Sequence, residues 1–416
     1  MKAVIFTLGC KVNKYESDSI ARTLTERGVE VSSKLEEADF YIINTCAVTS
    51  EAEKKSRQAV ARCKKFNPMA KVFVVGCASE KNSKQFVEKG VTFVRGTEKK
   101  QKILDYLDSV GQDVEELSTN YAEMDFALPS RIRTYIKIQD GCNNFCSYCI
   151  IPYLRGRSRS RDFDKIIEEA TSLKDTVKEI VLTGINVADF KANGQKALLP
   201  LLQELDKLGK RVRLSSMEDC LVTEEFVEGL SHLKNFCPHF HLSLQSGCDQ
   251  TLKRMNRKYT TAEFANSVNL IRKYFPFAGI TTDVIVGFCD ESEEEFVQTK
   301  QFVQNIRFSE LHIFSFSPRE GTVAAKLYKD LPSEIKKERA KVLEQIAKGL
   351  KEEFIQKNSG QVEEILFEEK EGEYFVGYSK NYIKCYAKSE KDLVNLVLKG
   401  KIVEPFKDGA ICEIIF

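Results

Sequence analysis

The chain has 416 residues, 13 cysteines and a formal net charge of +2 at pH 7. This length exceeds what one hydrophobic core usually supports, so two or three domains are expected, and the near-neutral charge argues against a globally basic nucleic-acid binder while leaving local basic patches open. No apolar run approaches the roughly 18 residues of a membrane-spanning helix, and the opening run at 3–8 is too short for a secretory leader. We therefore expect a cytoplasmic protein without membrane segments, whose reduced cysteines serve as metal ligands rather than as disulfides.

The first predicted domain, residues 1–112, alternates short apolar runs with longer segments of helical period. This rhythm is typical of an α/β fold with a doubly wound parallel sheet. The expected strands are 4–8, 40–44, 72–75 and 91–94, and the expected helices are 15–27, 49–66 with Thr49 as the cap, and 99–110.

Three cysteines follow the first three of these strands. Cys10 stands in TLGC, Cys46 in INTC and Cys77 in VVGC. In a parallel sheet the three positions fall at the same edge, where doubly wound folds place their ligands. Each alone would be an ordinary buried thiol, but their joint placement favours a metal or cluster site. Cys63, inside a charged helical segment, is interpreted as structural.

A polar, acidic linker is expected at 113–130, followed by a second domain at 131–356. This domain again alternates strands and helices, which predicts a partial (β/α)6 barrel with its chemistry at the carboxyl ends of the strands. The expected strands are 135–138, 179–182, 211–214, 240–244, 280–286 and 310–314.

The most specific motif follows the first of these strands. Cys142, Cys146 and Cys149 are spaced CxxxCxxC, and three thiolates on one short loop can hold three irons of a four-iron cluster, leaving the fourth iron open to a small molecule. Three core cysteines are a poor alternative, because polar residues separate them. A zinc knuckle would need a fourth ligand nearby, and Cys220 is about 70 residues downstream.

This motif resembles that of the radical S-adenosylmethionine (SAM) superfamily, and the run CSYCIIPYLRGRSRSR resembles its methylthiotransferase branch. The resemblance implies that the Cys142, Cys146 and Cys149 cluster reduces SAM to a 5′-deoxyadenosyl radical, with Tyr148 beside the adenine. It also implies that Cys10, Cys46 and Cys77 bind an auxiliary [4Fe-4S] cluster involved in sulfur transfer. The run LGCKVNKYES resembles the subfamily that modifies threonylcarbamoyladenosine in tRNA.

Strand-end residues of the second domain are candidates for a SAM pocket. Gly184 and Gly287 stand where a backbone could approach a ligand, and by resemblance they belong to the methionine-binding and adenine-binding segments. Glu218 and Gln245 could bind ribose or position substrate. Tight turns, capping and surface roles remain open for all four. The chain departs from its relatives at Cys289-Asp290, where Pro-Gly is usual, which puts the shape of that loop in doubt. The four histidines show no ligand spacing.

Basic residues near the cluster loop suggest a polyanionic substrate. Arg155, Arg157, Arg159 and Arg161 alternate with small or polar residues and could grip RNA phosphates, although a loop with internal ion pairs is an equal alternative. A second basic cluster, on the fourth unit of the barrel, consists of Lys253, Arg254, Arg257 and Lys258.

After a charged helix at 334–357, the last part of the chain, 357–416, resembles a TRAM domain, a small RNA-binding β-barrel. The expected strands are 362–367, 374–379, 383–387, 393–398 and 411–416. With nine lysines against eleven acidic residues, this module has a net charge of −2. RNA binding would have to use a local patch or aromatic stacking; the candidates are Lys380, Lys384, Lys388, Tyr374, Tyr378, Tyr382 and Tyr386.

The leading hypothesis is a tRNA methylthiotransferase that adds a methylthio group to C2 of N6-threonylcarbamoyladenosine at position 37. The resemblance implies two [4Fe-4S] clusters and SAM as cofactors, and tRNA, a flavodoxin- or ferredoxin-like electron donor and a sulfur source as partners. The alternatives are a methylthiotransferase acting on isopentenyladenosine in tRNA or on a ribosomal-protein aspartate, and a non-catalytic iron–sulfur RNA-binding protein.

Overall fold

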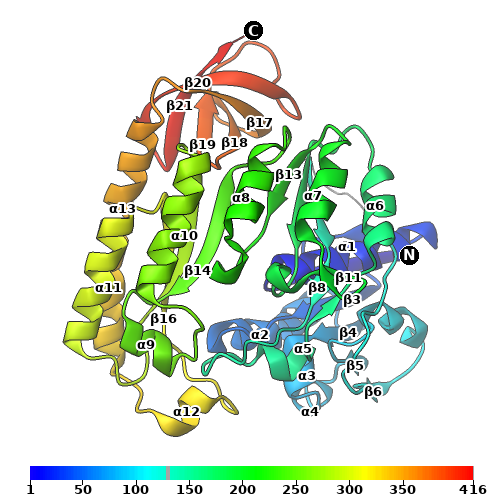
Figure 1. The fold of residues 1–416 in the computed structure, drawn as a ribbon. Helices are drawn as coiled ribbons and strands as arrows, with labels where there is room; N and C mark the ends of the chain where they lie inside the picture. The colour runs from blue at the N-terminus through cyan, green and yellow to red at the C-terminus, as the bar shows by residue number, and fades with distance from the viewer. Residues whose placement is uncertain (128–131, 416) are drawn as a thin grey trace.

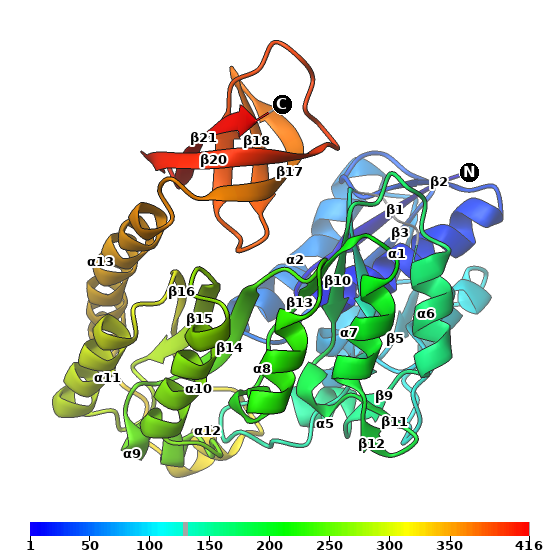
Figure 2. The same cartoon turned by 45° about the horizontal axis from the view of Figure 1, so that its top comes forward.

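A computed structural model describes residues 1–127 and 132–415, in three parts that follow the chain from an amino-terminal sheet domain to a small carboxyl-terminal barrel (Figures 1 and 2). Within these residues, every helix is too short or too polar to cross a membrane. The end of the predicted linker and the predicted boundary at 130–131 lie outside the described residues.

The first part is a six-stranded parallel sheet in the order β2-β1-β3-β4-β5-β6. Its strands are β1 Lys2–Thr7, β2 Glu30–Ser32, β3 Phe40–Thr45, β4 Lys71–Gly76, β5 Phe93–Arg95 and β6 Gly111–Asp113. Its helices are α1 Lys11–Glu26, α2 Ser50–Phe66, α3 Cys77–Lys81, α4 Lys84–Val87 and the 3-10 helix η1 Lys100–Tyr106. Thr49 caps α2 as predicted, because its side chain accepts a hydrogen bond from Ala52 N at 3.1 Å. The predicted helix at 99–110 is instead the short η1, followed by β6.

The segment after β6 is packed against both neighbouring domains. Ser19 Oγ of α1 donates to the carbonyl of Asp125 at 2.6 Å, and the backbone N–H of Ala127 donates to Glu169 at 3.0 Å. The connection between the domains is therefore fixed along its described length.

The second part contains all six predicted barrel strands, arranged as two parallel sheets, β7-β10-β13 and β14-β15-β16. Parallel bridges at Val212–Phe236 and Met217–Leu242 join the two sheets into one open, partial barrel. The strands are β7 Arg133–Lys137, β8 Gln139–Asp140, β9 Arg159–Ser160, β10 Glu179–Thr183, β11 Lys191–Ala192, β12 Gln195–Lys196, β13 Arg211–Leu214, β14 His239–Gln245, β15 Gly279–Val286 and β16 Glu310–Ser315.

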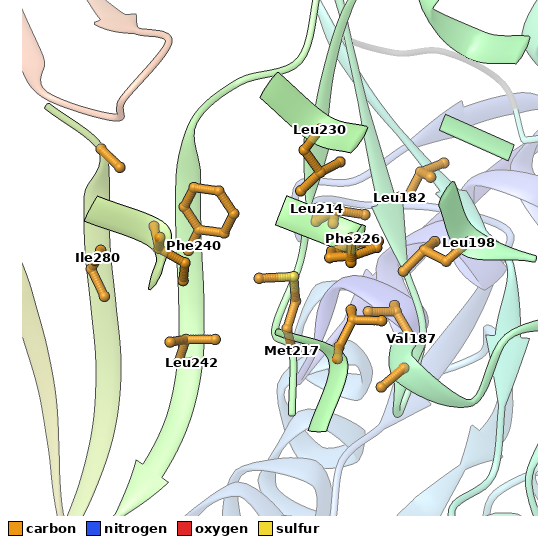
Figure 3. Packing of buried hydrophobic residues seen from close by; sticks show 14 of the residues in the cluster. Leu182, Val187, Leu198, Leu214, Met217, Phe226, Leu230, Phe240, Leu242 and Ile280 are labelled. Atoms are coloured by element: carbon orange, nitrogen blue, oxygen red, sulfur yellow. The ribbon is translucent and has the colours of Figure 1, made fainter. Parts of the chain in front are cut away.

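The longer helices of this part cover the outside of the partial barrel, whereas several short ones lie beyond the ends of its strands (Figure 1). They are α5 Ile151–Arg155, α6 Phe163–Thr171, η2 Val187–Asp189, α7 Leu198–Asp206, η3 Asp219–Leu221, α8 Glu224–Ser231, α9 Asp249–Arg254, α10 Thr261–Tyr274, α11 Glu293–Ile306, α12 Val323–Leu327 and α13 Ser333–Lys357. The core forms between strands and helices, and Figure 3 shows Met217 between Leu242 and Leu214, where the two sheets meet. Alternate residues of each strand face this core, which leaves the others to face the barrel interior.

The third part is a closed five-stranded barrel in the order β17-β18-β19-β21-β20. Its strands are β17 Val362–Glu371, β18 Tyr374–Ser379, β19 Lys384–Ala387, β20 Val397–Phe406 and β21 Gly409–Ile415. The strand predicted at 393–398 is wrong for its first part, because β20 begins at Val397 and Asn395 has a φ of +65°, a left-handed conformation typical of turns. Residue 416, at the end of the last predicted strand, lies outside the described residues.

This third part covers the amino ends of the barrel strands, opposite the end where α5 and α9 lie (Figures 1 and 2). Arg211 donates to the carbonyls of Tyr378 and Ser379 at 3.1 Å each. The ring of Tyr382 stacks on His239 with centroids 4.5 Å apart, and a Cβ on Gly279 would lie 2.2 Å from Asn381 O. The loop after β18 therefore closes one end of the partial barrel.

The candidate RNA contacts of this module are largely engaged within the chain. Lys380, Lys384 and Lys388 each pair with a carboxylate, and Tyr386 is buried. Tyr378 and Tyr382 stack on one another at 4.9 Å beside Arg133. These residues hold the module together or hold it against the barrel.

Candidate active site

The loop that carries Cys142, Cys146 and Cys149 begins with a tight turn after β8. Gly141 has a φ of +71°, and a Cβ there would lie 2.0 Å from the carbonyl oxygen of Arg157, so this position requires glycine. The backbone N–H of Cys142 donates to Gly156 O at 3.1 Å, and that of Cys149 donates to Cys146 O at 3.0 Å. These bonds fold the CxxxCxxC segment back on itself and bring the three thiols together.

The three thiols are half-buried, and N–H groups donate hydrogen bonds to two of the sulfur atoms. Burial raises the pKa of Cys142 to about 11 and that of Cys149 to about 12, and the neighbouring thiols add to the effect. The backbone N–H of Asn144 lies 3.4 Å from Cys142 Sγ, and Arg257 Nη1 lies 3.3 Å from Cys146 Sγ. Thiols that are costly to ionise alone, surrounded by donors to sulfur, fit an iron–sulfur cluster, whose charge favours the thiolate form.

A cavity of about 410 Å³ opens beside Cys146. Glu218 and Arg257 form an ion pair in its wall, and Arg257 also donates to Ser243 O at 3.1 Å. Arg257 thus links the cluster loop to the cavity. Sequence reasoning placed Arg257 in a second basic cluster and missed this contact, because residues 146 and 257 meet only in the fold.

The two candidate glycines of the SAM pocket are explained by close protein contacts. A Cβ on Gly287, whose φ is +66°, would lie 2.5 Å from Cγ of Lys336 on α13. A Cβ on Gly184 would lie 3.0 Å from Oε1 of Gln139, just before the cluster loop. Each glycine therefore has a packing reason of its own, and its approach to SAM stays a prediction.

Gln245 is buried, and Tyr148 is half-buried. The Tyr148 ring packs edge-to-face on Phe288, with centroids 6.3 Å apart, in a small apolar cluster beside the loop. Gln245 ends β14 with a φ of +68° at a break in the pairing with β15. The structure places both near the carboxyl ends of the strands, and their contact with SAM stays a prediction.

Cys10, Cys46 and Cys77 meet at the carboxyl edge of the first sheet, after β1, β3 and β4. Cys46 and Cys77 are buried, whereas Cys10 is exposed. Burial and the neighbouring Cys77 and Cys10 thiols raise the pKa of Cys46 to about 11. Gly9 has a φ of +98°, and a Cβ there would lie 2.7 Å from Cys46 Sγ, so the turn after β1 needs a glycine to pass this thiol. The three thiols form a second group that could hold a cluster.

A buried ion-pair network lies between the two cysteine sites. Arg155, at the end of α5, donates to Asn13 Oδ1 at 2.6 Å and to Glu16 and Asp140 at 3.0 Å each. Lys137 lies 2.8 Å from the same Glu16 carboxylate. Burial opposes the ionisation of Glu16, but Arg155, Lys100 and Lys137 outweigh it and hold the pKa of this carboxyl well below its usual range. The network joins the first sheet to the loop that carries the CxxxCxxC motif.

The structure corrects the prediction that Arg155, Arg159 and Arg161 grip phosphates. All three are buried: Arg159 pairs with Glu98 at 2.9 Å, and Arg161 pairs with Glu169 and Glu123. Arg157 is the exposed member of the four and lies over the Phe145 ring, 4.3 Å from its centroid.

Sequence reasoning also missed Arg319, in the loop after β16. Its guanidinium donates to Ala47 O at 2.5 Å and pairs with Glu53 at 2.8 Å. The loop containing Cys46 is thus held from the far side of the barrel as well.

The histidines without ligand spacing in the sequence do form a group in the fold. His241, Asp283 and His312 stand on β14, β15 and β16, and their potential ligand atoms lie within 4.8 Å of one another. The three residues lie on neighbouring strands, so their spacing in the sequence does not predict that they come together. The three side chains face the barrel interior.

Comparison with known proteins covers nearly the whole chain. Residues 136–303 match the model of the radical SAM superfamily, and residues 2–96 match that of uncharacterized protein family UPF0004. A threonylcarbamoyladenosine tRNA methylthiotransferase of Bacillus subtilis (strain 168) is 38% identical, over 100% of this chain and 97% of its own. A tRNA-2-methylthio-N(6)-dimethylallyladenosine synthase of Methylacidiphilum infernorum is 35% identical, over 93% of this chain and 89% of its own.

Among solved structures, a radical S-adenosylmethionine methyltransferase from Kitasatospora setae shares the fold with a TM-score of 0.57. The match covers 78% of this chain and 77% of the other, at 12% sequence identity. At that identity the likeness bears on the fold alone.

Proposed function

This chain belongs to the radical SAM methylthiotransferase family, and from that premise we propose that it adds a methylthio group to C2 of N6-threonylcarbamoyladenosine at position 37 of tRNA. The observation that carries the proposal is the placement of two three-cysteine groups on either side of the Arg155 network. One group would hold the cluster that generates the radical, and the other would hold the cluster that takes part in sulfur transfer.

The reaction needs chemistry that side chains alone do not supply. An aromatic C–H offers neither an acidic proton nor a leaving group, so acid–base groups cannot exchange it for sulfur. A [4Fe-4S] cluster with bound SAM supplies one-electron cleavage of SAM and thereby a radical that removes hydrogen from such a carbon. Cys142, Cys146 and Cys149 would hold that cluster, and Cys10, Cys46 and Cys77 would hold an auxiliary [4Fe-4S] cluster for sulfur transfer.

The other residues position these groups. Arg257 donates to Cys146 Sγ and, paired with Glu218, shapes the adjoining cavity, so it would orient whatever binds at the open side of the loop. Glu16 and Asp140 hold Arg155 from two domains, which would keep the two cysteine groups at a fixed separation. The proposed SAM contacts are Tyr148, Gly184, Glu218, Gln245 and Gly287.

The choice of nucleoside rests on the nearest subfamilies. Five relatives named threonylcarbamoyladenosine tRNA methylthiotransferase are 33–38% identical to this chain, and three dimethylallyladenosine synthases are 30–36% identical. The run LGCKVNKYES supports the same branch. The proposed partners are tRNA, a flavodoxin- or ferredoxin-like reductant and a sulfur source, in the cytoplasm.

Mass spectrometry of tRNA nucleosides from a deletion strain tests the proposal. We expect 2-methylthio-N6-threonylcarbamoyladenosine to disappear and its unmethylthiolated precursor to accumulate, with recovery when the gene is restored. An unchanged pool of this nucleoside would overturn the proposal, and loss of the isopentenyl nucleoside instead would assign the chain to the other tRNA branch.

A second measurement separates an enzyme from a binding protein. The reduced, reconstituted chain incubated with SAM should release 5′-deoxyadenosine. A non-catalytic iron–sulfur RNA-binding protein would release no 5′-deoxyadenosine.

A further inference from the structure

Three polar side chains meet on the inner face of the sheet formed by β14, β15 and β16. The strand register pairs His241 with Thr281, and it pairs Asp283 with His312. Residues that alternate with them, such as Leu242, belong to the hydrophobic core between the strands and the helices. Because side chains alternate along a strand, the two histidines and the aspartate all face the barrel interior.

The distances between these side chains suit a shared metal ion. Their potential ligand atoms lie within 4.8 Å of one another, and His241 Nε2 lies 3.4 Å from Asp283 Oδ2. Nitrogen and oxygen ligands lie about 2.0–2.2 Å from a bound transition metal, so two ligands of one ion can be up to about 4.4 Å apart. His241 and Asp283 meet this limit as they stand. His312 is exposed on the edge strand of its sheet, and a shift of about 0.5 Å brings its ring within the same limit.

A buried hydroxyl group fixes the orientation of the His241 ring. His241 Nδ1 lies 2.8 Å from Thr281 Oγ1, and the same oxygen lies 3.2 Å from His239 Nε2. One hydroxyl can accept from the first ring and donate to the second, which leaves the lone pair of His241 Nε2 directed toward Asp283. A bare nitrogen and a carboxylate oxygen at this separation repel one another unless a cation lies between them. Metal-bound histidines usually have such a partner on the other ring nitrogen.

We propose that His241, Asp283 and His312 bind one divalent first-row transition-metal ion inside the barrel. Two imidazoles and one carboxylate form the ligand set that holds Fe²⁺ in non-haem iron proteins, and Mn²⁺ accepts the same kinds of ligand. Three protein ligands leave coordination positions open toward the barrel interior. The group contains no cysteine, so the ion would be additional to both proposed clusters, and the inference does not depend on the proposed function.

The alternative is an ion pair in which a protonated His241 donates to Asp283 and no metal binds. Mn²⁺ separates the two, because its electron paramagnetic resonance signal changes when the ion is bound and because it competes poorly for thiolates. The test uses the full chain with its clusters reconstituted and oxidised, since oxidised [4Fe-4S] clusters are diamagnetic and do not obscure the signal. Treatment with a chelator beforehand removes any metal already bound at the open site.

We expect one Mn²⁺ ion per chain, with nitrogen couplings from two imidazoles in its electron spin-echo spectrum. His312→Asn should weaken binding by about tenfold or more and leave one imidazole coupling, and Thr281→Val should weaken binding by about tenfold, because the His241 ring loses the bond that orients it. Since His312 is exposed, its replacement should leave the iron content and the fold unchanged. His232→Asn, the matched control at an exposed histidine after α8, should bind Mn²⁺ as wild type does.

Two results would overturn the inference. One is a wild-type chain that binds Mn²⁺ no more tightly than the His312→Asn chain does. The other is bound Mn²⁺ without any nitrogen coupling, which would mean that the ion lies only on surface carboxylates.

Discussion

Arg155 lies where α1, β8 and α5 meet, and its side chain is 1% exposed. Two carboxylates, Glu16 and Asp140, accept its hydrogen bonds, and both are nearly as buried. An ion pair of this kind adds little to stability by itself, but removing one partner leaves the others charged and without water. Two residues along the chain, Arg157 rests on an aromatic ring at the surface, so neighbouring arginines of one motif meet opposite environments.

We predict that Arg155→Met lowers the free energy of unfolding by about 3–5 kcal/mol, because Glu16 and Asp140 lose one of their buried counter-charges and keep their lysine partners. Urea denaturation followed by circular dichroism measures this. Arg157→Met, the matched variant, should change the free energy by less than about 0.5 kcal/mol. If the two variants destabilise the protein equally, the buried network does not have the role described for it.

At the scale of elements, β14 starts at the contact between the barrel and the carboxyl-terminal module. His239, its first residue, stacks on Tyr382 and is buried. Burial and the nearby Arg213 hold the pKa of His239 well below its ordinary value of about 6.5. The neutral ring is therefore the form that the folded state accepts.

A pH dependence follows. Since the pKa of His239 is lower in the folded than in the unfolded chain, the unfolded chain binds the proton first. The stability contribution is complete above about pH 6.5 and falls below it, with a limiting slope of about 1.4 kcal/mol per pH unit. The difference in unfolding free energy between wild type and His239→Asn, measured from pH 5 to pH 8, should show this slope. His232→Asn, at an exposed position after α8, should show no such slope. A difference between wild type and His239→Asn that does not change with pH would contradict the prediction.

Elements were predictable from the sequence where local pattern decides them. The six barrel strands are apolar runs bounded by polar residues, and the three cysteine-bearing strand ends follow from the alternation of strands and helices. The edge strands β2 and β6 are three residues long and partly exposed, so they have no such pattern. Ion pairs escape this kind of prediction: Arg155 and Glu16 are 139 residues apart, and the arginine run looks the same whether carboxylates or phosphates face it.

At the scale of the molecule, two domains each bring three thiols toward a shared boundary. α1 packs along β7 on one side, and Arg319 holds the Cys46 loop on the other. The two cysteine groups therefore belong to separate domains that meet at one fixed interface. Because each group has its own three cysteines, we expect each cluster to bind without the other.

We expect reconstituted protein to contain about eight irons, twice the content of one [4Fe-4S] cluster. Replacing Cys142, Cys146 and Cys149 by alanine should leave about four, and so should replacing Cys10, Cys46 and Cys77. Iron analysis with a colorimetric chelator measures this, and Cys63→Ala, at a buried cysteine of α2 away from both groups, should keep all eight. An intact protein with only four irons would remove the auxiliary cluster and its part in sulfur transfer.

The loop of the carboxyl-terminal module that covers the amino ends of the barrel strands limits where reactants can enter the barrel. With that end closed by Ser379 and Tyr382, and the open side covered by the first domain, reactants reach the interior past the carboxyl ends of the strands. RNA and SAM would then enter the barrel interior through the same opening, at the carboxyl ends of the strands. The family resemblance implies that two SAM molecules are used for each modified nucleoside. RNA bound at this opening would keep the products of the first SAM from leaving. The proposed function would then run in sequence: the auxiliary site would be loaded with sulfur before the RNA binds, and each round would end when the RNA leaves.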